Sequence, residues 1–111
     1  MRGDIVPKKN SAIKPIPSTK LKEDVRLWLK DNDLFYDTAI YNAAEWKKRG
    51  ERYGDGATLV ITTEGPLHGI LNHYYGTKHA YDLEEGFIQF LSKRGYWYDL
   101  GESWMILIYK L

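Results

Sequence analysis

Side chains that exchange protons gather in one short stretch of the chain: Thr62, Thr63, Glu64, His68, His73 and His79. A carboxylate beside an imidazole is a common pair for general acid–base catalysis, with hydroxyls as hydrogen-bond partners. Glu64 and His68 are therefore the candidate catalytic residues of a small acid–base enzyme. A structural explanation competes with this hypothesis, because a carboxylate near the start of a helix is already stabilised by the helix dipole.

The spacing of the histidines argues against a metal site. His68 and His73 are five residues apart, so on a helix their directions differ by roughly 140°. The helix of a zinc protease instead places two histidines four residues apart on one face. The chain contains no cysteine, which excludes thiolate metal sites and disulfides. The glycine turns at 54–56 and 64–66 match no phosphate-loop spacing, so we expect neither a metal nor another cofactor.

A second set of candidates is aromatic and alternates with charged residues: Tyr74, Tyr75, Tyr81, Tyr96 and Trp97. Exposed tyrosine and tryptophan are frequent anchors of protein interfaces, and they also stack on nucleic-acid bases. The competing explanation places most of these rings in the core or in cross-strand pairs. The leading functional prediction is a small, soluble, non-enzymatic module that binds another protein through exposed Tyr and Trp.

A third set of candidates is basic. Lys47, Lys48, Arg49 and Arg52 form a basic cluster that fits the end of a helix, where cations complement the dipole. The first 22 residues add six Lys or Arg against one Asp, whereas the rest has ten basic and fourteen acidic residues. A nucleic-acid-associated protein that uses this tail and the basic cluster is therefore the alternative to protein binding.

The strand that positions the proton-exchanging residues is predicted at 57–63, where a β-branched apolar run lies between glycine turns. Pro66 suits the first position of a helix that would continue to Gly76. Gly69 lies inside this helix and costs about 1 kcal/mol relative to alanine. Its presence predicts that another group packs closely against the helix there.

Apolar periodicity and capping patterns predict three further helices, at 19–30, 43–49 and 83–94. Ser18 or Thr19 is expected to cap the first helix, and capping boxes that begin at Asn42 and Asp82 are expected to start the other two. Residues 34–41 are ambiguous, because their aromatic and β-branched content favours a strand while nearby alanines suit a helix. The helix is preferred by a small margin.

Residues 95–109 predict two strands joined by a short loop, in which Gly101 suits a left-handed turn position. Both faces of the last strand are apolar, which places it in the interior of the sheet. The expected fold class is α+β, with several helices packed on a small, mainly antiparallel sheet that includes a C-terminal β-hairpin.

The length of 111 residues indicates one domain. Three prolines in residues 1–17 prevent a helix, which predicts a flexible basic tail followed by a single α+β domain at 18–111. The chain has no signal-peptide run and no stretch of about 18 apolar residues. We therefore expect a cytoplasmic protein with no membrane partner, whose ligand and oligomeric state the sequence leaves open.

Overall fold

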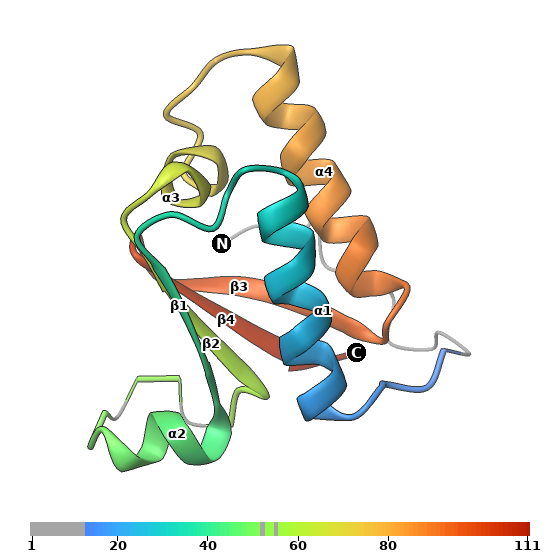
Figure 1. Ribbon diagram of the computed structural model, residues 1–111, viewed down its shortest axis with the longest axis vertical. Coiled ribbons are helices and arrows are strands. Elements are labelled where there is room, and N and C mark those ends of the chain that lie inside the picture. The colour runs from blue at the N-terminus through green and yellow to red at the C-terminus, as the bar shows by residue number, and fades with distance from the viewer. Residues whose placement is uncertain (1–12, 52, 55) are drawn as a thin grey trace.

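The computed structural model describes residues 13–51, 53–54 and 56–111 (Figure 1). In chain order, the helices and strands are α1 (Ser18–Asp31), β1 (Thr38–Asn42), α2 (Ala43–Lys48), β2 (Leu59–Thr63), α3 (Pro66–Leu71), α4 (Lys78–Ser92), β3 (Tyr96–Glu102) and β4 (Met105–Lys110). The α+β class predicted from the sequence is confirmed.

The four described strands form one antiparallel sheet in the order β1-β2-β4-β3. The predicted C-terminal hairpin is β3 and β4, and β4 is an interior strand, as its two apolar faces require. The prediction for Gly101 is wrong, because its φ is not in the left-handed region. Instead a bulge between Leu100 and Glu102 bends the strand there, and a Cβ at Gly101 would lie 3.0 Å from the Met105 sulfur.

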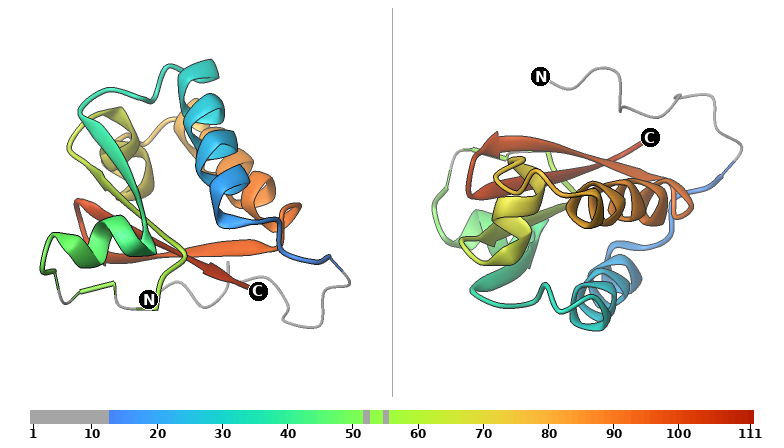
Figure 2. Two further views of the ribbon diagram at one scale, coloured as in Figure 1. Left: turned by 60° about the horizontal axis from the view of Figure 1, so that its bottom comes forward. Right: turned by 90° about the horizontal axis from the view of Figure 1, so that it is seen from above.

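Helices α1, α3 and α4 lie on one face of the sheet (Figure 2). Side chains of alternate strand residues point toward these helices and form the main core. Its strand residues include Leu59, Ile61, Ile106 and Ile108, and its helix residues include Leu21, Val25, Leu29, Phe87 and Leu91. Burial of this apolar surface is the main stabilising term of the fold.

The opposite face of the sheet is covered differently. Its apolar strand residues Val60, Met105 and Leu107 pack with Trp46, which α2 contributes. The Trp46 indole N–H donates a 2.6 Å hydrogen bond to the carbonyl of Tyr53, which holds α2 on this face. α2 is only six residues long and follows directly on β1, so it lies at one end of the sheet (Figure 1).

The ambiguous segment 34–41 contains the first residues of a strand, so the preference for a helix is wrong. β1 pairs along its whole length with β2, and Ile40 lies opposite Ile61 in the main core. This long-range pairing overrides the local helix propensity of the alanines. The capping box at Asn42 is confirmed: its side chain accepts a hydrogen bond from the Glu45 amide, and the Glu45 carboxylate accepts one from the Asn42 amide.

The first helix begins within one residue of its predicted start, but its predicted cap is wrong, and so is the predicted start of the last helix. Pro17 precedes the first residue of α1, and no described side chain caps that end, so neither Ser18 nor Thr19 is the N-cap. α4 begins at Lys78, well before residue 83, because the Thr77 side chain caps it by accepting a hydrogen bond from the Ala80 amide. Thr77 lies five residues before Asp82, so the predicted capping pattern lies inside α4.

The start of α3 at Pro66 is confirmed, but its predicted end at Gly76 is wrong. The helix ends at Leu71, and His73 adopts a left-handed conformation with φ of 59°. The Asn72 side-chain amide donates hydrogen bonds to the carbonyls of His68 and Ser103. The second of these bonds attaches the end of α3 to the β3–β4 turn.

The end of the predicted tail is attached to the domain. The Ile16 amide donates to the Arg94 carbonyl, and the Ile16 carbonyl accepts a 2.6 Å hydrogen bond from the Tyr96 hydroxyl. A Cβ at Gly95, whose φ is +88°, would lie 2.6 Å from the Pro15 backbone. Residues 15 and 16 therefore pack on the start of β3, whereas residues 1–12 lie outside the described part.

Candidate functional site

Three loops meet at the end of the sheet opposite α2, where β1 begins and β2 ends. The Glu64 amide, after β2, donates a 3.0 Å hydrogen bond to the carbonyl of Asp37, before β1. The Thr63 amide donates a 2.9 Å bond to the carbonyl of Trp104, in the β3–β4 turn. The strand-to-helix turn singled out from the sequence is therefore the point where these loops converge.

A chain of hydrogen bonds joins two of the loops. Thr38 donates its single hydroxyl proton to the Tyr36 carbonyl, at 2.7 Å. In the 2.8 Å contact between the Thr38 and Thr63 hydroxyls, Thr63 must therefore be the donor. The Thr63 oxygen in turn accepts from the Gly65 amide, at 3.3 Å. This hydroxyl relay runs from Gly65 to Tyr36 and accounts for the burial of Thr63, which is 2% exposed.

Gly65 allows the two loops to approach each other. A Cβ at this position would lie 2.0 Å from the Tyr36 carbonyl oxygen, which is backbone and has little freedom to withdraw. Any other residue at 65 would push the segment before β1 away from the turn. The close approach of the loops therefore depends on glycine at this position.

The converging loops border a hollow of about 410 Å³, here named the acidic hollow, lined by Asp37, Thr38, Ala39, Thr62, Thr63, Glu64 and Trp104. Ala39 and Thr62 are register partners on the sheet face that α2 covers at its other end. The Trp104 side chain is 40% exposed. Among the described residues, no Lys, Arg or His lines the hollow, and neither Asp37 nor Glu64 forms an ion pair.

The sequence prediction did not anticipate the acidic hollow as a whole. The sequence predicts two strands joined by a short loop at 95–109, and the structure places Trp104 in the turn between β3 and β4. A tryptophan in a tight turn rarely reaches the core, so a position in the loop would have indicated that Trp104 lies at the surface. The residues around Asp37 do not indicate that it belongs to a site, because only the pairing of β1 with β2 brings it beside Glu64.

The structure does not bring the predicted acid–base pair together. Glu64 is exposed and lines the acidic hollow, but His68 does not. The His68 imidazole instead contacts the Tyr74 ring edge-on, with centroids 5.1 Å apart. No hydrogen bond between Glu64 and His68 occurs in the described part of the chain, so the acid–base hypothesis gains no support from the geometry.

The other two histidines form no catalytic or metal site with His68. The His73 imidazole nitrogen lies 2.8 Å from the Glu84 carboxylate, and its ring contacts Tyr81. His79 is exposed on the first turn of α4. Among residues 13–51, 53–54 and 56–111, no group of three His, Cys, Asp or Glu side chains could hold a metal ion.

Three of the predicted binding residues, Tyr74, Tyr75 and Tyr81, are here named the tyrosine patch. Their side chains are 65%, 46% and 47% exposed, and each ring has a neighbour that holds it. Tyr74 contacts His68, and Tyr81 contacts His73. The Tyr75 ring lies over Gly69, where a Cβ would be 2.6 Å away. The close packing predicted from Gly69 is confirmed.

The remaining two predicted aromatic residues do not belong to the tyrosine patch. Tyr96 is fully buried in the main core, so its prediction as a surface residue is wrong, and burial raises its pKa. Trp97, the next residue, alternates to the other face of the sheet and packs on Tyr109, with ring centroids 5.3 Å apart. Burial and the nearby Asp99 carboxylate raise the pKa of Tyr109.

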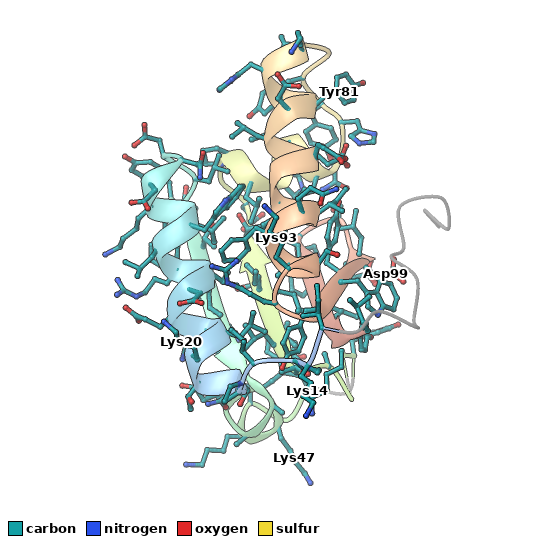
Figure 3. The ribbon with its side chains drawn as sticks, turned by 90° about the vertical axis from the view of Figure 1, so that its right-hand side faces the viewer. Lys14, Lys20, Lys47, Tyr81, Lys93 and Asp99 are labelled. Carbon is teal, nitrogen blue, oxygen red and sulfur yellow. The ribbon has the colours of Figure 1, made fainter. Side chains whose placement is uncertain are left out.

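Lys47, the first residue of the basic cluster, extends from α2 at the far end of the molecule from Tyr81 (Figure 3). Lys47 and Lys48 are exposed. The Arg49 guanidinium lies 4.9 Å from the centre of the Tyr41 ring and donates a 3.3 Å hydrogen bond to its hydroxyl. Arg52 lies outside the described residues, so the structure brings together only part of the predicted cluster.

Comparison with known proteins identifies no relative, since no family model, no curated protein and no solved structure matches the chain. In the described part of the chain, no helix combines the length and the apolar character needed to cross a bilayer. The candidate function therefore depends on the geometry of the surface alone.

Proposed function

We propose that this protein is a small non-enzymatic module that binds another protein through the tyrosine patch. The observation that carries the proposal is the packing of the Tyr75 ring on Gly69, which leaves Tyr75 46% exposed. A glycine in the middle of α3 costs helix stability. The missing side chain at Gly69 leaves room for the Tyr75 ring, which is thereby fixed on the surface. None of the three tyrosines belongs to the main core.

Fixed rings favour binding because little side-chain entropy remains to be lost when a partner is bound. Tyrosine also presents a large apolar area together with a hydroxyl that can form a hydrogen bond, a combination common in binding surfaces. The two carboxylates of the acidic hollow lie at the other end of α3 from the Tyr74 and Tyr75 loop. We expect a partner surface with apolar and basic side chains, because guanidinium groups also stack on tyrosine rings.

The two alternative functions have weaker geometric support. For nucleic acid, the Arg49 guanidinium already contacts the Tyr41 ring, which leaves Lys47 and Lys48 as the α2 cations with no ion pair to a described residue. For an enzyme, Glu64 and His68 would need to share one pocket, and the acidic hollow includes only Glu64. Protein binding is therefore the function that the described surface supports best.

A peptide library without sequence bias tests the proposal. Peptides are selected against the full chain, and their affinities are then measured for a variant that combines Tyr74→Ser, Tyr75→Ser and Tyr81→Ser. We expect most selected peptides to bind this variant at least tenfold more weakly. The matched control is Tyr53→Ser, which removes a ring that is 66% exposed but lies outside the patch. The proposal fails if the selected peptides bind the patch variant and the wild type equally well.

A single substitution tests the seating of Tyr75 without removing a ring. Gly69→Ala places a methyl group where the Tyr75 ring now lies, so the ring must move. We expect the selected peptides to lose several-fold in affinity while the domain remains folded, because alanine favours the helix. Unchanged peptide affinity would show that the position of the Tyr75 ring does not matter for binding.

A further inference from the structure

We infer that the acidic hollow binds a basic side chain of the partner protein, and that arginine fits it best. This inference rests on the proposed function and names the chemistry of one partner residue. No residue of α2 lines the hollow, because α2 covers only the other end of this sheet face. Its volume of about 410 Å³ is ample for a guanidinium group and its aliphatic stem.

The lining of the hollow favours a cation. Asp37 and Glu64 are tied together by the backbone hydrogen bond between their loops, so their carboxylates belong to one short stretch of surface. No described basic side chain forms an ion pair with either of them. A bound cation would supply the opposite charge that both carboxylates lack, and charge-assisted hydrogen bonds to carboxylates are stronger than neutral ones.

Trp104 is a separate observation that points to the same ligand. The residue is 40% exposed although its neighbour Met105 is buried, so Trp104 lines the hollow instead of joining the core. Tryptophan is the aromatic residue that attracts cations most strongly. A guanidinium can stack on the indole and at the same time donate to a carboxylate, which a compact ammonium group does less well.

The Trp104 turn is held in place before any ligand arrives. The Trp104 carbonyl accepts the Thr63 amide hydrogen bond, and the preceding Ser103 carbonyl accepts one from the Asn72 side chain. Asn72 also directly precedes the loop that carries Tyr74 and Tyr75. The Asn72 hydrogen bond therefore joins the turn that carries Trp104 to the segment that leads to Tyr74 and Tyr75.

The test uses Nα-acetyl-arginine amide as the probe and Nα-acetyl-citrulline amide as its uncharged analogue. Each is titrated into the isotope-labelled full chain, and NMR follows the indole N–H of Trp104 with that of Trp97 as an internal control. We expect arginine amide to shift the Trp104 signal in a saturable way at millimolar concentrations, with citrulline amide at least tenfold weaker. Equal shifts from both probes, or equal shifts at Trp97 and Trp104, would overturn the inference.

Two variants separate this inference from the proposed function. Asp37→Asn combined with Glu64→Gln should weaken arginine amide at least tenfold, whereas Asp99→Asn, a half-buried carboxylate outside the hollow, should not. Unchanged arginine binding in the double variant would refute the inference. The variant that combines Tyr74→Ser, Tyr75→Ser and Tyr81→Ser should leave arginine amide binding intact. The peptide experiment therefore tests the tyrosine patch, and the arginine amide experiment tests the hollow independently of it.

Discussion

The hydroxyl relay from Gly65 to Tyr36 makes a quantitative prediction about the framework of the site. Thr63→Val keeps the shape of the side chain, so no cavity forms, but it removes the donor to Thr38 and the acceptor for the Gly65 amide. The first contact is short, at 2.8 Å, and the second is long, at 3.3 Å. A net hydrogen bond contributes about 1 kcal/mol, so we expect a loss of about 1–2 kcal/mol in the free energy of unfolding.

Thr38→Val perturbs the same relay from the other side. It leaves the buried Thr63 hydroxyl without its acceptor, which costs about 1–3 kcal/mol. The Tyr36 carbonyl that loses its donor is exposed, so water can replace that bond. Removing both hydroxyls leaves no buried hydroxyl unsatisfied. We therefore expect the double variant to be less destabilised than the sum of the single variants by at least about 0.5 kcal/mol.

Urea and thermal unfolding of the four full-length proteins, followed by circular dichroism, measure this coupling. A loss of 1 kcal/mol should lower the melting temperature by about 4–8 °C in a domain of this size. The matched control is Thr62→Val, which changes a half-buried neighbour with no hydrogen-bonded hydroxyl among the described contacts. If the costs of Thr38→Val and Thr63→Val add within about 0.3 kcal/mol, the two hydroxyls do not act as one relay and the donor assignment is wrong.

Further substitutions test other contacts of the fold. Gly65→Ala should destabilise the domain by more than about 3 kcal/mol, because a Cβ would lie 2.0 Å from a backbone carbonyl; a stable variant in chemical denaturation would contradict the close approach of the loops. Tyr96→Phe should cost about 1 kcal/mol by removing the hydroxyl that binds the carbonyl before α1, and an unchanged unfolding midpoint would exclude that bond in solution. Although burial raises the pKa of Asp24, hydrogen bonds and attraction from its Lys and Arg partners lower it overall, below the ordinary 3.8. Its stabilising effect is present above pH 3.8 and is lost as the pH falls below that value, so acid titrations should show a smaller loss of stability for Asp24→Asn than for the wild type.

Local patterns in the sequence determined several elements without help from the rest of the chain. The capping box at Asn42 and the proline at position 66 each mark a helix start through groups a few residues apart. The two apolar faces of the last strand placed it inside the sheet, because both faces must be covered. Gly69 predicted close packing, since an interior glycine weakens a helix unless another group uses the space. In each case the physical cause lies within one element.

Only the tertiary structure decided the features that depend on distant partners. Residues 38–42 form a strand because β2 supplies the pairing, although the local propensities nearly balance. Tyr96 is buried and Trp97 lies on the other face because the register of β3 against β4 sets which residues face the helices. Asp37, Glu64 and Trp104 share one hollow although up to 67 positions apart, since antiparallel pairing brings the ends of separate strands together. Contacts of this kind have no local signature, and for this reason the sequence located the turn at 62–68 but not the hollow beside it.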